Sequence, residues 1–188
     1  MTSPLIQDRM PEAEVSLRLA FHLLTLPGSD GAAQVAIDGA QVRVHGSEVF
    51  SIETFVDDQG WKQVESTAKH KWQGEYWKDK LHLTVHSRPG EGDVVAQVSD
   101  KCIRAECKGG PLTHKPGNPE YRILRGALGT LMTLDEIGVQ DILVVAVPDT
   151  PAFRSLADKW RTAPLVARSQ VQIVLVGRDG SVQGLSLS

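Results

Sequence analysis

The sequence predicts an α/β protein in which a mixed β-sheet is flanked by helices. Two observations lead to this fold class: hairpin signals precede a run of apolar strands, and the later strands alternate with helical segments. The continuous apolar runs Ile142–Val147 and Val171–Val176 are typical of strands covered on both faces. A chain of 188 residues can bury one good core, with or without a small appended module, so we expect a single domain.

The first third of the chain predicts one helix followed by a β-rich segment. Glu12–Leu26 carries apolar residues at helical spacing and is terminated by Pro27-Gly28. Gln34–Val44 alternates apolar and polar residues around Asp38-Gly39, which indicates a hairpin. Val49–Val56 is expected to form a further strand.

The rest of the chain predicts three more strands in succession and two helices. Leu81–Val85 alternates apolar with polar residues, and Val94–Val98 and Cys102–Lys108 flank a short polar turn. Glu120–Ile137 and Thr150–Arg161 have helical patterns, and each is followed by one of the buried apolar runs.

The hairpin of the second and third of these strands would bring reactive side chains to one end of the sheet. Pairing of its strands returns Glu106 and Lys108 to the neighbourhood of Asp93. Because side chains alternate along a strand, Glu106 and Lys108 should point to one face, and Ile103 and Cys107 to the other. The expected result is a cluster of two carboxylates and an amine.

Such a cluster suits a divalent metal ion with a water molecule beside it. Mg²⁺ takes oxygen ligands, and one or two carboxylates with substrate phosphate oxygens make a sufficient site. We expect Asp93 and Glu106 to be ligands, with the carbonyl group of Cys107 as a candidate third. Lys108 would position the nucleophile or hold the phosphate. The alternative is an ordinary hairpin with charged residues at its edge.

The pattern also resembles a known family. It reads Gly92-Asp93-Val94-Val95-Ala96, then a turn, then Ala105-Glu106-Cys107-Lys108-Gly109. An Asp before an apolar strand, followed by an apolar-Glu-x-Lys strand, resembles the PD-(D/E)xK nuclease superfamily, which has the restriction-endonuclease-like fold. One departure is Gly92, which stands where the family often has Pro.

The resemblance implies an α-βββ-α-β core over about residues 81–176, preceded by a helix and a β-rich extension over residues 12–80. It implies a metal-dependent nuclease that hydrolyses phosphodiester bonds of DNA with Mg²⁺ or Mn²⁺, using Asp93, Glu106 and Lys108. Restriction, defence, or recombination and repair would be typical roles, in a homodimer or as a subunit of a larger nuclease assembly. The alternatives are an inactive member of the fold that binds nucleic acid or protein, and a scaffold that binds only protein.

Charge and composition restrict the mode of nucleic-acid binding. The net charge of −3 argues against coating of nucleic acid through bulk electrostatics, but a local basic face remains compatible with a nuclease. Basic and aromatic residues interleave in one segment, and two arginines share a face of the helix after the hairpin. The nucleic-acid-binding candidates are Lys69, Lys71, Trp72, Trp77, Lys78, Arg122 and Arg125. The alternative is that the tryptophans anchor the segment to the core.

Three further sets of residues are weaker candidates for a site. In the resemblance, a helix before the sheet sometimes lends an extra acid, which makes Glu14 a candidate, and Glu91 lies in the turn before the hairpin. His82 and His86 could ligate a metal from one face of their strand, although the sequence suggests no third ligand nearby.

The composition agrees with a cytoplasmic protein that has no membrane partner. No apolar run approaches the ~20 residues of a membrane helix, and the N-terminus does not resemble a secretory signal. The only cysteines, Cys102 and Cys107, share one expected strand, where they are too far apart to form a disulfide with each other.

Overall fold

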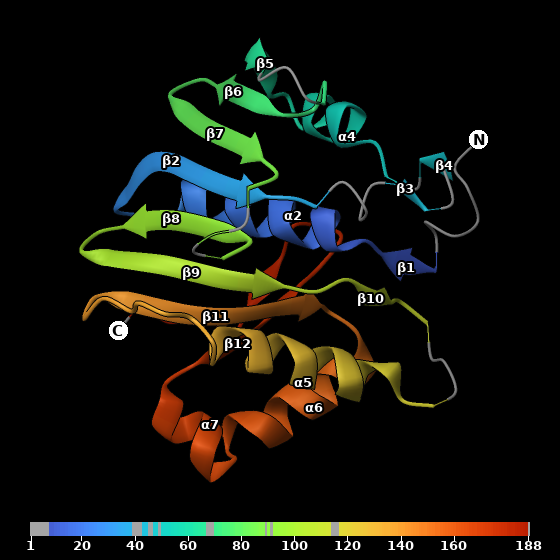
Figure 1. Cartoon of the computed structure of the whole chain (residues 1–188), viewed down its shortest axis with the longest axis vertical. Helices are drawn as coiled ribbons and strands as arrows, with labels where there is room; N and C mark the ends of the chain where they lie inside the picture. Colours follow the sequence, from blue (N-terminus) through green and yellow to red (C-terminus); the bar gives the residue numbers. More distant parts are fainter. Residues whose placement is uncertain are drawn as a thin grey trace.

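The computed structural model describes residues 8–38, 43–44, 47–48, 50–66, 70–88, 90, 92–113 and 117–187. A nine-stranded mixed sheet forms the centre of the molecule and has helices on both faces (Figure 1). In spatial order its strands are β13 (Val182–Gln183), β12 (Gln172–Val176), β11 (Asp141–Pro148), β9 (Lys101–Cys107), β8 (Val94–Val98), β2 (Ser29–Ala36), β7 (Leu81–His86), β6 (Gly74–Lys78) and β5 (Lys62–Ser66).

Two short strand pairs and five helices complete the described elements. The pairs are β1 (Arg9–Met10) with β10 (Gly110–Pro111), and β3 (Arg43–Val44) with β4 (Ser47–Glu48). The helices are α2 (Glu12–Thr25), α4 (Ile52–Asp58), α5 (Pro119–Leu131), α6 (Pro151–Arg161) and α7 (Pro164–Ser169). No helix in these parts of the chain is both long and apolar enough to cross a membrane.

Strand directions gather several strand ends at one edge of the sheet. β9, β11 and β12 are mutually parallel, and β2 is parallel to β7. β8 runs antiparallel to both of its neighbours, β2 and β9. The carboxyl ends of β2, β7, β9, β11 and β12 therefore lie at the same edge as the start of β8. We call this edge the carboxyl edge; it is the right-hand side of Figure 1.

Helix α2 covers one face of the centre of the sheet. Its apolar stripe, which includes Val15, Leu19 and Leu23, is fully buried in one cluster with residues such as Val35 and Ile103 from the strands. Alternate residues of the strands contribute to this cluster, as the two-residue period of a strand requires: Ala33 and Val35 of β2, Val94, Ala96 and Val98 of β8, and Ile103, Ala105 and Cys107 of β9. This burial provides most of the driving force for the central packing.

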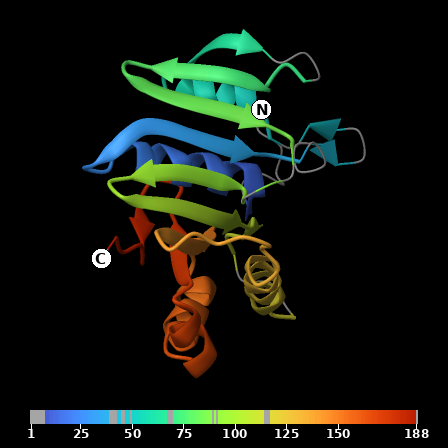
Figure 2. The ribbon, with the colours of Figure 1, turned by 60° about the vertical axis from the view of Figure 1, so that its left-hand side comes forward.

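The described helices cover the opposite face only at one side of the sheet. Val145 and Val147 of β11 pack with Leu124 of α5 and Phe153 of α6 in a second cluster, which is separate from the α2 cluster. Figures 1 and 2 show α5, α6 and α7 beside β11 and β12, away from β2, β7 and β8. Among the described helices, none lies over β2, β7 and β8 on this face. We call it the open face.

Most of the expected elements are confirmed. The helix that was expected at Glu12–Leu26 is α2, and the strands that were expected at Leu81–Val85, Val94–Val98 and Cys102–Lys108 are β7, β8 and β9. The later elements also agree, although α5 ends at Leu131 rather than at Ile137.

The prediction of a strand at Val49–Val56 is wrong, because Ile52–Asp58 is helix α4. The Ser51 hydroxyl accepts a hydrogen bond from the Thr54 amide at 3.4 Å and caps the helix. Ile52 and Val56, four residues apart, are both buried. The apolar residues of this segment fit a helical spacing as well as a strand alternation, and tertiary packing favoured the helix.

The hairpin that we expected at Gln34–Val44 is also wrong. β2 is hydrogen-bonded to β7 on one side and to β8 on the other. Neither edge of β2 is therefore available to pair with the segment that follows it. Residues 39–42 lie outside the described residues. The local Asp38-Gly39 signal therefore did not decide the partner of β2.

The core of the sheet does not begin near residue 81. β2 lies between β7 and β8 in space, although residues 37–80 separate it from β7 in sequence. Three successive strands in space, β2, β8 and β9, therefore form the centre, and α2 packs on them. The boundary that we expected near residue 81, between an extension and a core, therefore divides strands that belong to one sheet.

Candidate active site

The β8–β9 hairpin forms as the sequence predicts and brings Asp93 close to Glu106. Val98 pairs with Lys101 across a tight turn in which Ser99 has a φ of 56°, and Val94 pairs with Ala105. The Asp93 amide donates to the Ala105 carbonyl at 2.8 Å. This register places Asp93 at the carboxyl edge, beside the end of β9.

Asp93 completes the hydrogen bonding of the sheet at this edge. Its Oδ2 atom accepts a hydrogen bond from the Cys107 amide at 2.8 Å, and its carbonyl accepts one from the Ala36 amide at 2.8 Å. Gly92 precedes it with a φ of 139°, and a Cβ atom there would lie 3.0 Å from the Ala105 carbonyl oxygen. Proline, with φ near −65°, does not fit this conformation. The departure at Gly92 therefore has a local structural cause.

Glu106 and Lys108 lie on the face of β9 that is opposite to α2, and they contact each other. The Lys108 Nζ atom is 2.8 Å from Glu106 Oε1, and Glu106 is 7% exposed. Ile103 and Cys107 are fully buried on the other face against α2, as the alternation predicted. The Cys107 thiol contacts the Ser16 hydroxyl in this core, so its side chain is not directed at the cluster.

A third acid, Glu12, joins the cluster from the first turn of α2. Its Oε1 atom is 3.0 Å from Lys108 Nζ, so that the ammonium group bridges Glu12 and Glu106. The sequence reasoning did not find Glu12. We call Glu12, Asp93, Glu106 and Lys108 the edge cluster.

Gly109 allows the start of α2 to approach the end of β9. A Cβ atom at Gly109 would lie 2.6 Å from the Glu12 amide nitrogen and 2.6 Å from the Met10 carbonyl oxygen. Pairing of Met10 with Gly110 holds the same two segments together. The two glycines directly after Lys108 are the signal that could have pointed to this close approach.

Glu14, the helical acid that we considered, lies outside the edge cluster. Its Oε1 atom is 3.0 Å from Arg18 Nη2, and its Oε2 atom is 3.1 Å from Arg178 Nη2. The Glu14 side chain is almost completely buried. It therefore ties α2 to the turn that follows β12, and Glu91 lies outside the described residues.

Burial and mutual repulsion disturb the ionisation of the edge cluster. Burial, reinforced by the charge of Glu106, raises the pKa of Asp93 from 3.8 to about 7. Burial also raises the pKa of Glu12, although Lys108 opposes this. Burial disfavours the Lys108 ammonium, but the hydrogen bond to Glu106 and the charge of Glu12 outweigh it, so the pKa of Lys108 is raised. Lys108 therefore stays charged at neutral pH.

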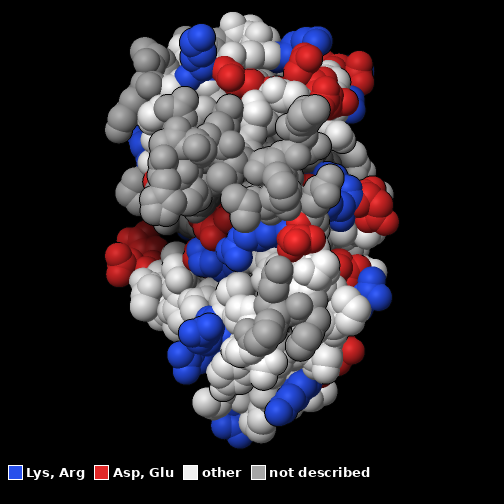
Figure 3. Space-filling model, turned by 90° about the vertical axis from the view of Figure 1, so that its right-hand side faces the viewer, with Lys and Arg blue, Asp and Glu red and all other residues white. Residues whose placement is uncertain are grey.

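The edge cluster offers the type of ligand atom that a hard divalent cation takes. Its three acids supply only oxygen ligands, and one ammonium cannot neutralise all of them. Burial is the main cause of the raised pKa of Asp93, and the nearby charge of Glu106 adds to it, so a bound cation would favour the ionised form. Within the described ranges, no group of three or more His, Cys, Asp and Glu side chains is already arranged to hold a metal ion. Figure 3 looks onto this edge and shows acidic and basic atoms side by side near the middle of the molecule.

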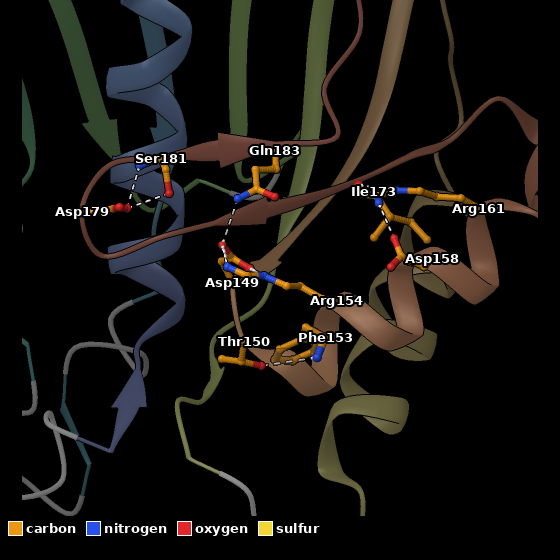
Figure 4. A network of polar contacts seen from close by, with 10 residues as sticks. All are labelled: Asp149, Thr150, Phe153, Arg154, Asp158, Arg161, Ile173, Asp179, Ser181 and Gln183. Carbon is orange, nitrogen blue, oxygen red and sulfur yellow. Dashed lines mark hydrogen bonds and ion pairs between the residues drawn. The ribbon is translucent and has the colours of Figure 1, made fainter.

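Another acid at the carboxyl edge, Asp149, is engaged elsewhere. It follows β11, and its Oδ2 atom is 2.7 Å from Arg154 Nη2 and 3.3 Å from Gln183 Nε2 (Figure 4). The next residue, Thr150, caps α6 by accepting a hydrogen bond from the Phe153 amide at 3.3 Å. Asp149 therefore holds α6 and β13 to the sheet.

The basic aromatic segment is divided by strand β6 rather than forming one surface. Trp72 is 8% exposed and stacks on His70, whereas Trp77 is 41% exposed and stacks on His82. β6 separates the two tryptophans, because its first residue pairs near the carboxyl edge and its last pairs at the opposite edge. The Lys78 ammonium donates to the Gln59 carbonyl at 2.7 Å.

The remaining basic candidates lie at the surface. Lys71 is exposed beside Trp72, and Lys69 lies outside the described residues. Arg122 and Arg125 are exposed on α5, which begins at the carboxyl edge (Figure 1). Arg125 lies over the ring of Tyr121, with 5.9 Å between the guanidinium carbon and the ring centroid.

The two histidines of β7 have different surroundings. His82 Nε2 is 3.3 Å from Glu75 Oε2. Burial, then the charge of Arg88, lowers the pKa of His86. Neither belongs to a described group of side chains that could hold a metal ion.

Comparison with known proteins adds no family to this description. No protein-family model matches the chain, and neither a curated protein nor a solved structure matches it. The function must therefore be argued from the site itself.

Proposed function

We propose that the protein is a metal-dependent nuclease that hydrolyses phosphodiester bonds of DNA. The observation that carries this proposal is the convergence of Asp93, Glu106 and Lys108 from adjacent strands, with Glu12 beside them. The elements α2, β2, β8, β9, α5 and β11 follow the α-βββ-α-β order of the restriction-endonuclease-like fold, with β3 to β7 and α4 inserted between β2 and β8, and this order supports the proposal.

Asp93 and Glu106 would hold Mg²⁺ or Mn²⁺, with the Cys107 carbonyl as a further ligand. A cation held there would lower the pKa of a water molecule and offset negative charge on the phosphoryl group. Asp93 must be ionised to act as a ligand, and the cation would lower its raised pKa.

Lys108 would serve as a donor in this reaction rather than as a base, because it is an ammonium group paired with Glu106 and Glu12 before the substrate binds. It would leave the carboxylates partly and donate to the attacking water or to a phosphate oxygen. The water oxygen would form a bond to phosphorus while the bond to the departing sugar oxygen breaks, and that oxygen would leave with the bonding electron pair and take a proton from solvent. The proton released by the water passes to solvent or to a nearby carboxylate such as Glu12.

Plasmid cleavage tests the proposal directly. Supercoiled DNA incubated with Mg²⁺ or Mn²⁺ should be nicked or linearised by the wild-type protein. Glu106→Gln and Lys108→Met should each lower the rate by about 100-fold or more, as losses of transition-state stabilisation do. Glu53→Gln on α4 and Lys159→Met on α6 change exposed residues of the same types and should cleave normally. Equal cleavage by all five proteins, or none by any, would contradict the proposal.

A second candidate function is a catalytically inactive binding module. Lys108 already contacts both Glu106 and Glu12, which favours a structural role for these three residues. This reading predicts binding to nucleic acid without metal and without cleavage. Filter binding to DNA and RNA at low and moderate salt separates it from a scaffold that binds only protein, because phosphate contacts weaken steeply with salt.

As a nuclease, the protein would act as a homodimer that cuts both strands, or as a subunit of a larger nuclease assembly. Restriction, defence, or recombination and repair are the roles that fit such an enzyme in the cytoplasm.

A further inference from the structure

The open face contains a hollow directly beside the edge cluster. It has a volume of about 280 Å³ and is lined by Gln34, Ala36, His86, Arg88, Gly90, Gly92 and Val95. Gly92 immediately precedes Asp93, and the Ala36 amide donates to the Asp93 carbonyl at 2.8 Å. A ligand in the hollow would therefore lie next to the acids of the edge cluster.

The floor of the hollow is made of small residues. Ala36 and Val95 come from the adjacent strands β2 and β8, and neither Gly90 nor Gly92 has a side chain. A floor of this kind admits the flat face of a ring. Ligand pockets commonly measure roughly 300–1,000 Å³, so this hollow is sized for one small unit rather than for a length of duplex.

The rim supplies the polar groups that a nucleotide needs. The guanidinium group of Arg88 can donate two parallel hydrogen bonds to two oxygens of a phosphate group. His86 Nδ1 accepts a hydrogen bond from the Arg88 amide at 3.3 Å, which leaves Nε2 as the donor of the neutral ring. Gln34 is exposed on the same face and offers an amide that matches base edges.

We propose that this hollow binds one unpaired nucleotide of the substrate strand, next to the phosphodiester bond that is cleaved. The phosphate lies against Arg88, and the base lies over the small floor between His86 and Gln34. This inference rests on the proposed nuclease function for its position beside the cleaved bond. It specifies the substrate further: DNA with an unpaired segment at the point of cleavage is preferred to continuous duplex, because a base within a duplex stack is not free to enter the hollow.

Binding without metal tests the hollow independently of catalysis. In the presence of EDTA, a fluorescent single-stranded oligonucleotide should bind the wild-type protein more tightly than a duplex of the same sequence. Arg88→Gln should weaken single-strand binding by about tenfold, as loss of a charge-assisted hydrogen bond does. Gln34→Ala should also weaken it, whereas Arg168→Gln, an exposed arginine on α7, should not. Amide chemical shifts of Gly92 and Val95 should move when a dinucleotide is added.

Cleavage kinetics then separate failure of this inference from failure of the nuclease proposal. If both are right, Arg88→Gln raises KM for a substrate with an unpaired segment and leaves kcat nearly unchanged. If binding depends on Arg88 but no protein cleaves, the hollow stands as a binding site and the nuclease proposal fails. If the wild type cleaves and Arg88→Gln and Gln34→Ala bind and cleave like the control, the hollow is not a nucleotide site. Equal affinity for single strand and duplex would also overturn the inference.

Discussion

At the scale of single residues, Asp93 combines a structural and a chemical role. Its carboxylate accepts a hydrogen bond from the Cys107 amide, beyond the last carbonyl that β8 offers to β9. The same carboxylate is buried beside Glu106. The hydrogen bond favours the ionised form, but burial and repulsion outweigh it. An acid held in this way is costly to ionise, and a cation bound there, as we propose, would favour its ionised form.

The raised pKa of Asp93 predicts an unusual dependence of stability on pH. Between pH 4 and 7 the folded protein binds more protons than the unfolded chain, so the free energy of unfolding should decrease as pH rises through this window. The full shift corresponds to at most roughly 4 kcal/mol. Urea unfolding in EDTA at several pH values measures this slope, which Asp93→Asn should flatten. An unfolding free energy that rises over the same window in both proteins would contradict the assignment.

At the scale of elements, the site depends on how closely α2 approaches β9. Glu12 reaches Lys108 only because Gly109 leaves room for the backbone of Met10 and Glu12. The short β1–β10 pair holds this approach, and the ion pair between Glu14 and Arg178 fixes the same part of α2 to the turn after β12. The position of one helix end therefore decides whether the cluster has a third acid.

Substitution of Gly109 tests this dependence. Gly109→Ala should lower the free energy of unfolding by about 1–3 kcal/mol, as overpacking against backbone does, and should reduce cleavage by moving Glu12 away from Lys108. The matched control is Gly126→Ala on α5, where a Cβ atom meets nothing within 4 Å. It should raise stability by up to about 1 kcal/mol and leave cleavage unchanged. Denaturant unfolding and the plasmid assay provide both measurements, and equal stability changes in the two variants would refute the argument.

At the scale of the whole molecule, two helical layers are distributed unequally over one sheet. α2 covers the face behind β2, β8 and β9, and of the described helices α5 and α6 cover the other face only at the side of β9, β11 and β12 (Figure 2). The open face of β2, β7 and β8 adjoins the edge cluster. A substrate strand bound in the hollow, as we propose, would therefore lie on the open face without displacing a described helix.

Metal binding should stabilise the whole fold, since a ligand that binds only the folded state shifts the unfolding equilibrium. At a Mg²⁺ or Mn²⁺ concentration about 100-fold above Kd, the expected gain is about 2.7 kcal/mol, which raises Tm by several degrees. Glu106→Gln should lose this gain, whereas Glu53→Gln should keep it. Because the cation needs ionised Asp93, the gain should increase from pH 6 to pH 8. Thermal unfolding with and without metal measures it, and an equal shift in wild type and Glu106→Gln would show that the cation binds elsewhere.

The sequence alone determined the local elements and the hairpin of the site. Periodicity predicted α2 and α6, and continuous apolar runs predicted β11 and β12, because these patterns act over a few neighbouring residues. The turn after Val98 and the alternation along β9 placed Asp93, Glu106 and Lys108 correctly relative to one another.

Only the tertiary structure decided what depends on contacts between distant segments. β2 joined β7 and β8 instead of the segment that follows it, and Ile52–Asp58 became helical where its neighbours buried Ile52 and Val56. Glu12 replaced Glu14 as the acid beside Lys108, because the close approach at Gly109 selects one position on the helix. Strand partners and helix orientation are set by packing over the whole core, and no local pattern of residues carries that information.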